Sequence, residues 1–165
     1  MRQRDYNSAS FSPNGCGCLV LLILLTPVIG VLVFSSFFLC HANKAKQSEA
    51  KQYVSSMNRG QQAYYAENTK FATSIAALGI GIKTETTNYK YSVRATKKAA
   101  FNYGVSKQKT EKSYVAAVFL FGAGEEKTTS SILCEADDRG TIKPAEPIYQ
   151  NGNFICSPGT KEVTK

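Results

Sequence analysis

The sequence predicts an α+β fold in which one long N-terminal helix packs on a four-stranded antiparallel sheet. Residues 41–68 repeat apolar side chains at helical spacing, and short segments after residue 88 alternate between apolar and polar side chains. A third observation is the uncharged segment of 23 residues from Cys18 to Cys40, directly before the helix. The 165 residues suffice for one domain and an anchor, rather than for two independent cores.

Residues 1–17 are expected to form a polar leader-like segment, and residues 18–40 a transmembrane helix. As a helix, the uncharged segment would be about 35 Å long, which exceeds the ~30 Å hydrocarbon core of a bilayer. The apolar part of a secretory signal peptide is shorter. In a lipoprotein signal the apolar segment precedes the acceptor cysteine, whereas Cys16 and Cys18 precede it here. The chain is therefore expected to cross the inner membrane once.

Two observations disagree about the orientation of this span. Arg2 and Arg4 precede it and four basic residues follow it within residues 44–59, so the positive-inside rule places the C-terminal domain in the cytoplasm. Cys134 and Cys156 have 21 residues between them. If bridged, they would close a loop worth about 3 kcal/mol, and such a bond persists only in an oxidising compartment. Two buried free thiols are the alternative, and we favour the exported orientation.

Residues 41–68 are expected to continue the span as an amphipathic helix, with lysines and glutamines on its polar side. Its apolar or small side chains are Ala42, Ala45, Ala50, Tyr53, Val54, Met57, Gly60 and Tyr64. Because no turn signal intervenes, the span and this helix should form a single helix of about 45 residues. A connecting loop follows, with a short helical turn near Ser74 to Leu78 and then Gly79 and Gly81 as helix breakers.

Residues 69–165 are expected to form a globular, β-rich head. Alternation over residues 89–95 and 101–105 predicts two half-buried strands in a hairpin that turns through Lys97 and Lys98. Residues 113–121 are apolar on both faces and predict a central strand, and residues 130–136 predict a fourth. Short loops between consecutive strands predict an antiparallel meander. The helix of residues 41–68 should cover the apolar inner face of this sheet.

The net charge of +8 is unevenly distributed along the chain. Residues 70–112 carry nine basic and two acidic side chains, whereas residues 113–165 carry five basic and seven acidic ones. A basic patch of this kind attracts DNA, anionic polysaccharide or lipid headgroups. A solvated face is the alternative, because no nucleic-acid motif accompanies the lysines. The candidate anion-binding residues are Lys83, Lys90, Arg94, Lys97, Lys98, Lys107, Lys109 and Lys112.

Cys16 and Cys18 suggest a redox pair or half of a metal site. Cys40 and His41 would then be the further ligands, but they would lie at the opposite membrane face, ~30 Å away. A Cys-x-Cys pair also lacks the ligand set of structural zinc and the spacing of thioredoxin-like sites. Acylation is one alternative, and a helix start of small apolar residues is another. With no phosphate loop, paired catalytic carboxylates or partner for His41 in the sequence, we expect no catalytic residue, metal or cofactor.

Residues 42–93 contain Gln-Gln-Ala-Tyr-Tyr at residues 61–65 and Thr-Asn-Tyr-Lys-Tyr at residues 87–91. In these segments the chain resembles the type IV pilin-like G and H group of cyanobacteria. The resemblance implies a type IV pilin-like fold, a head outside the inner membrane and a terminal-loop disulfide between Cys134 and Cys156. It also implies a structural or accessory role, as a minor pilin, in a type IV pilus or a related secretion system, with other subunits as partners.

The N-terminal region departs from the pilin pattern. Pilins are cut after a leader glycine that precedes an aromatic residue, and they carry a glutamate at the fifth mature position. Here Gly15 and Gly17 are each followed by cysteine, with no glutamate nearby. That carboxylate persists in an apolar span because it pairs with a neighbour's N-terminal amine. We therefore expect an uncut, membrane-anchored protein, with cleavage after Gly15 or Gly17 as the alternative. The alternative function is an anchored extracytoplasmic module that binds DNA or acidic polysaccharide.

Overall fold

The structure is a computed structural model that describes residues 27–122 and 127–163, with side chains from Asn43 onward. The chain divides into two compact units, Met1–Ala42 and Asn43–Lys165. Helix α1, Pro27–Asn68, begins in the first unit and ends in the second. The predicted leader and residues 18–26 of the predicted span lie outside the described residues. Among the helices that the structure describes, none combines the length and the apolar composition needed to cross a bilayer.

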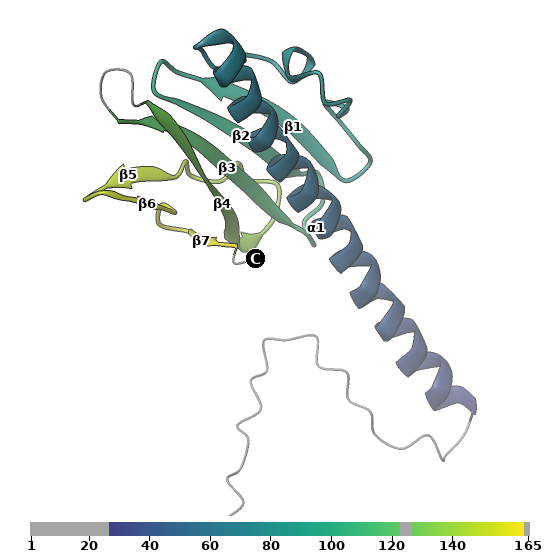
Figure 1. Cartoon of the computed structure of the whole chain (residues 1–165). Helices are drawn as coiled ribbons and strands as arrows, with labels where there is room; N and C mark the ends of the chain where they lie inside the picture. Colours follow the sequence, from purple (N-terminus) through teal and green to yellow (C-terminus); the bar gives the residue numbers. More distant parts are fainter. Residues whose placement is uncertain (1–26, 123–126, 164–165) are drawn as a thin grey trace, which may run out of the picture. The chain divides into compact units, whose positions relative to one another are not determined.

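The second unit contains an antiparallel sheet of five strands in the order β1-β2-β3-β4-β7 (Figure 1). Its strands are β1 Tyr89–Ala95, β2 Ala99–Ser106, β3 Lys112–Phe121, β4 Thr128–Arg139 and β7 Thr160–Glu162. Strands β5, Ile148–Gln150, and β6, Asn153–Ile155, form a separate hairpin. The consecutive pairing of β1 to β4 confirms the predicted meander. The prediction of four strands was wrong by one, because β7 adds to the edge of β4.

One face of the sheet packs against the C-terminal part of α1, as Figure 1 shows. Ala50, Val54 and Met57 of α1 are fully buried against Tyr91 and Tyr114 of the sheet. These helix residues follow one another at spacings of four and three, which places them on one face of the helix. The amphipathic pattern therefore identified these three positions correctly. It was wrong for Ala45, which is exposed, and for Gln61, which was expected on the polar side and is fully buried.

The helix approaches β2 closely because β2 presents small or polar residues to it. A Cβ atom added at Gly104 would lie 3.0 Å from Cγ2 of Val54, so even a methyl group there would require the Val54 side chain to shift. Beside this contact, Asn102 Nδ2 donates a 2.7 Å hydrogen bond to Oδ1 of Asn58. Asn58 and Asn102 are both buried, so the helix and the sheet are joined by a polar contact inside the core.

The apolar residues of β2 face away from α1, which corrects the prediction of a single apolar inner face. In the β1-β2 register Tyr91 lies opposite Gly104, and Arg94 lies opposite Phe101. Directly opposed residues share a face, so the apolar sets of the two strands lie on opposite faces. Phe101 and Tyr103 pack in a second core cluster, which Phe154 from the C-terminal region also joins. Helix α1 therefore packs on one face of the sheet, and residues of the C-terminal region pack on the other.

The connection between α1 and β1 contains the expected helical turn, a 3-10 helix at Ala76–Leu78 that ends at Gly79 with a positive φ of 64°. Further along, the connection pairs with the outer edge of β1. The Tyr91 amide donates to the Thr84 carbonyl at 2.8 Å, and the Thr86 amide donates to the Tyr89 carbonyl at 2.8 Å. Part of this edge strand is therefore already hydrogen-bonded.

Candidate functional site

The C-terminal loop, residues 140–157, is attached to the sheet by a disulfide between Cys134 and Cys156. Cys134 lies on β4 and is fully buried, and the Cα atoms of the two cysteines are 5.8 Å apart. The disulfide that the resemblance implied is therefore present. The alternative of two free thiols was wrong.

An ion pair holds the same loop against β1 and β2. Arg94 of β1 donates two hydrogen bonds to the Glu146 carboxylate, with Nε 2.6 Å from Oε1, and Tyr103 of β2 donates a third. The Ser157 hydroxyl donates to the Glu146 carbonyl. The bonds from Arg94 hold the pKa of Glu146 below its ordinary value, although partial burial opposes this effect. The loop is therefore fixed by a charged contact as well as by the disulfide.

A second carboxylate, Glu135 on β4, connects three elements. Lys51 of α1 lies 3.3 Å from it, Lys112 of β3 3.1 Å and Lys161 of β7 3.8 Å. The Tyr114 hydroxyl donates a further hydrogen bond at 3.0 Å. Burial alone raises the pKa of Glu135, but the bonds from Lys112 and Tyr114 and the charges of Lys112 and Lys51 outweigh it. The pKa of Glu135 therefore lies below its ordinary value.

Two more carboxylates attach α1 to the rest of the unit. Glu111 is fully buried, and its Oε1 accepts a 3.2 Å bond from Lys46, whereas its Oε2 has no partner among the described residues. Tyr91 donates to Glu49 at 3.3 Å. Burial and the charge of Glu49 raise the pKa of Tyr91, so its hydroxyl remains protonated at neutral pH. These contacts position the helix on the sheet.

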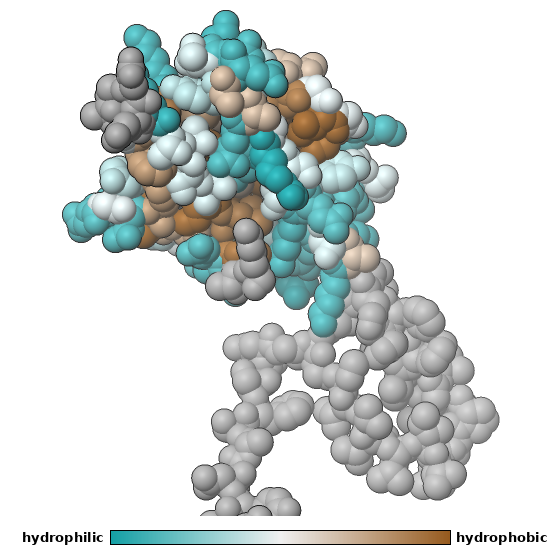
Figure 2. Space-filling view, in the orientation of Figure 1, coloured by the Kyte–Doolittle hydropathy of each residue, from teal (hydrophilic) through white to brown (hydrophobic). Residues whose placement is uncertain are grey.

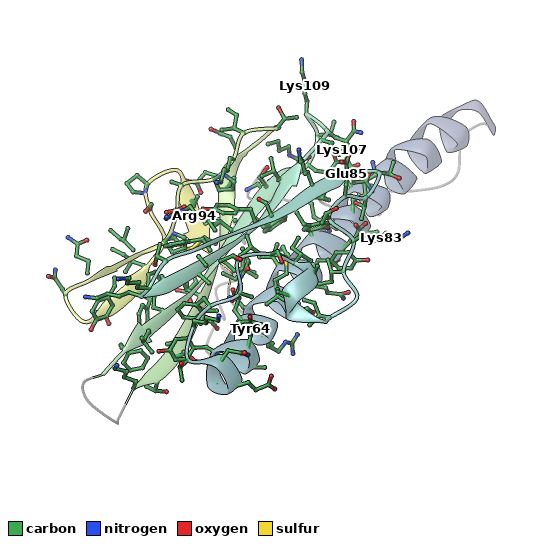
Figure 3. The ribbon with its side chains drawn as sticks, turned by 90° about the horizontal axis from the view of Figure 1, so that it is seen from above. Tyr64, Lys83, Glu85, Arg94, Lys107 and Lys109 are labelled. Carbon is green, nitrogen blue, oxygen red and sulfur yellow. A yellow bond between two sulfur atoms is a disulfide. The ribbon has the colours of Figure 1, made fainter. Side chains whose placement is uncertain are left out.

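The eight candidate anion-binding residues do not form one surface. Lys97 and Lys98 occupy the β1-β2 turn, whereas Lys107 and Lys109 occupy the β2-β3 turn at the other end of β2. Figure 3 shows Lys107 and Lys109 at one end of the sheet, well apart from Arg94. The basic segment of the sequence is therefore divided between two ends of the sheet.

Three of the eight are held in ion pairs, Arg94 with Glu146, Lys107 with Glu85 and Lys112 with Glu135. The other five make no ion pair within the described part of the chain. These are Lys83, Lys90, Lys97, Lys98 and Lys109, and all five are exposed.

The predictions about the N-terminal region stay predictions. Cys16, Cys18 and the two leader glycines lie outside the described residues, and Cys40 and His41 lie in the part of α1 whose side chains are not described. Among residues 43–122 and 127–163, no three His, Cys, Asp or Glu side chains are grouped as metal ligands.

The β5-β6 hairpin is a surface that the sequence analysis missed. Asn151 and Gly152 form its turn with positive φ angles of 51° and 81°, and an Asn-Gly pair between apolar segments is a strong hairpin signal. Tyr149 and Phe154 pack with ring centres 4.9 Å apart, yet Tyr149 is 55% exposed and Ile148 42% exposed. Figure 2 shows apolar surface in this region, beside β5 and β6.

The comparisons with known proteins identify a family. The sequence model of type IV pilin-like G and H proteins matches residues 47–157, which are more than half of the chain. This range contains the described part of α1 from Gln47, strands β1 to β6 and both bridged cysteines. Comparison with curated proteins and with solved structures gave no match. The chain belongs to the type IV pilin-like G and H family.

Proposed function

We propose that this protein is a structural or accessory subunit, a minor pilin, of a type IV pilus or a related secretion system. The family match over residues 47–157 carries the proposal. The helix packed on an antiparallel sheet and the disulfide-closed loop are consistent with it. Pilin-like proteins are generally structural rather than enzymatic, so the work of this chain is to pack against other subunits.

We place the Asn43–Lys165 unit outside the inner membrane, with residues 18–40 as a single span. The disulfide supports this location, because such bonds persist in oxidising compartments, whereas the positive-inside count opposes it. Protease added to intact spheroplasts should digest the unit, and Cys134 and Cys156 should resist alkylation until a reductant is added. Digestion that requires cell lysis, or two freely alkylated thiols, would place the unit in the cytoplasm.

We further propose that residues 1–17 remain on the membrane-anchored chain, because neither Gly15 nor Gly17 is followed by the aromatic residue and glutamate of a pilin processing site. The intact mass of the membrane-extracted protein tests this. A mass that includes residues 1–17 is expected. A mass lacking residues 1–15 or 1–17 would make the protein a processed subunit, and Gly15→Val and Gly17→Val variants would then identify the cleavage site.

The β5-β6 hairpin is the surface that we propose for contact with another subunit of the pilus. Its exposed Ile148 and Tyr149 adjoin Ile155, which is 38% exposed, and contiguous exposed apolar groups commonly mark protein interfaces. A photo-crosslinking residue at Tyr149 should capture a pilus subunit in the native membrane. The same residue at Lys90, an exposed position on β1, is the matched control. Equal capture at both positions would remove the hairpin from the interface.

A further inference from the structure

We propose that the cleft between the end of α1 and the β1-β2 turn binds an anionic saccharide. The cleft has a volume of about 490 Å³ and is formed by residues that follow α1 and by the end and turn of β1. The cleft is open to solvent, and of its lining residues only Phe71 is buried. The proposal does not depend on the subunit role. Of the eight candidate anion-binding residues only Lys97 lines the cleft, and Lys70 joins it there.

The charge of the cleft is positive. Lys70 and Lys97 line it from its two sides, and none of its lining residues is acidic. Neither lysine makes an ion pair with any residue that the structure describes. A lysine ammonium is a compact cation that binds carboxylate or sulfate groups through any of three donors. Two such cations facing one cleft favour an anionic ligand.

The floor of the cleft favours a saccharide over a nucleic acid. Phe71 is only 5% exposed, and its ring packs 4.8 Å from the ring of Tyr65 and against Val118. Single-stranded nucleic acids are bound by aromatic rings whose faces are free to stack on bases, and the Phe71 ring is not free in this way. The groups that a ligand would meet are instead the exposed lysine and threonine side chains, which suit the acidic groups and hydroxyls of a saccharide.

The threonines of the cleft supply a fixed rim and one available hydroxyl. Thr96 Oγ1 accepts from the Ala99 amide at 2.9 Å and donates to the Ala99 carbonyl at 3.0 Å, so it stabilises the turn that carries Lys97. Thr69 donates to the Asn68 carbonyl at the helix end. The Thr73 hydroxyl makes no hydrogen bond with any described residue, so it can both donate to and accept from a sugar hydroxyl. Thr69 and Thr96 are therefore held in place before a ligand binds.

The test measures binding of oligosaccharides to the full chain in detergent micelles at low ionic strength. Oligogalacturonate supplies carboxylates, and a sulfated galactan oligosaccharide supplies sulfates. Fully methyl-esterified oligogalacturonate is the neutral control, and single-stranded DNA of matched charge tests the competing ligand class. At least one anionic saccharide should bind more tightly than both the neutral control and the DNA, and raised salt should weaken that binding.

Matched variants locate the binding. Lys70→Gln with Lys97→Gln should raise the dissociation constant about tenfold or more. Lys83→Gln with Lys109→Gln removes the same charge outside the cleft and should change the constant by less than about twofold. Thr73→Val keeps the charge and the side-chain shape, and the loss of one hydrogen bond should weaken binding by roughly fivefold.

Three outcomes overturn the proposal. The first is that neither anionic saccharide binds at low ionic strength. The second is an equal loss of affinity in the two double variants, which would indicate diffuse attraction to a basic surface. The third is DNA binding as tight as saccharide binding with the same dependence on Lys70 and Lys97, which would assign the cleft to nucleic acid.

Discussion

Gly104 is the residue on which the approach of α1 to β2 most directly depends. In Gly104→Ala the new Cβ would lie 3.0 Å from Val54 Cγ2 and 3.1 Å from Tyr91 Cε1, two groups that are themselves packed in the core. We expect overpacking of this kind to lower the free energy of unfolding by about 1–3 kcal/mol. Urea unfolding of the full chain measures it. Ser92→Ala, at an exposed position on β1, should change stability by less than about 0.5 kcal/mol, and equal effects of the two changes would refute the packing argument.

The buried amide pair Asn58 and Asn102 should behave as one unit. Asn58 also donates to the carbonyls of Ala117 and Ile132 at 3.4 Å, so either single change to alanine leaves buried polar groups unpaired, at about 1–3 kcal/mol. The double variant should lose less free energy of unfolding than the two single variants lose together, with a coupling energy of about 0.5–3 kcal/mol. A double-mutant cycle measured by urea unfolding checks this prediction. As a control, the effects of Asn58→Ala and Lys83→Ala on the free energy of unfolding should simply add. If the effects of the two asparagine changes also add, the 2.7 Å bond between Asn58 and Asn102 has no energetic role.

Among the elements, the C-terminal loop is the one whose attachment can be tested most cleanly. The disulfide joins residues 22 positions apart, so replacing both cysteines with alanine should lower the free energy of unfolding by about 3 kcal/mol. Reductant should destabilise the wild-type protein by a similar amount and leave the variant unchanged. Equal stability of the reduced and oxidised wild-type protein would show that Arg94 and Glu146 hold the loop without the disulfide.

The elements also show what the sequence could predict. The helical pattern identified Ala50, Val54 and Met57, because apolar burial leaves a periodic trace in the sequence. Asn58 and Gln61 are buried on the same helix, but Asn58 pairs with Asn102 of β2 and Gln61 pairs with Ala72 in the loop after the helix. Because both partners lie outside the helix, its apolar periodicity does not indicate these two residues. The same limit explains the opposite faces of β1 and β2. Alternation shows that a strand has two faces, but only the pairing register decides which face meets the helix.

The candidate sites also differ in whether local sequence patterns or the fold determine them. The disulfide could be anticipated from a resemblance, whereas the division of the basic residues between two ends of the sheet depends on the course of β2. Lys70 was not among the candidates, because it joins Lys97 at the cleft only when the end of α1 and the β1-β2 turn come together. Strands β5 to β7 have three residues each, which is too short for alternation to be recognised.

For the whole molecule, we expect stability to fall in acid. The folded state holds the pKa of Glu135 and of Glu146 below ordinary values. Above an unfolded pKa of about 4.3 both states are ionised and the stabilisation is complete. As the pH falls below that value, these glutamates bind protons in the unfolded chain but remain ionised in the folded chain. The free energy of unfolding therefore decreases until the pH has passed the folded pKa.

Urea unfolding between neutral pH and pH 3 measures this dependence. Glu135→Gln should make stability depend less steeply on pH in acid, because the variant has lost one of the carboxylates whose pKa the folded state lowers. Glu67→Gln, at an exposed position without an ion pair in the described part of the chain, is the matched control and should keep the wild-type slope. An unchanged slope in Glu135→Gln would show that the ion pairs of Glu135 make no net contribution to folding.

The pairing of Thr84 and Thr86 with β1 has a consequence for many copies held close together. An open strand edge can template the addition of strands from neighbouring chains, which leads to irreversible aggregates. Here the connection after α1 occupies part of one edge, and β7 occupies part of the other beside Cys134. Copies of this chain held close together should therefore resist backbone polymerisation. Their association would then depend on side-chain contacts, which are reversible.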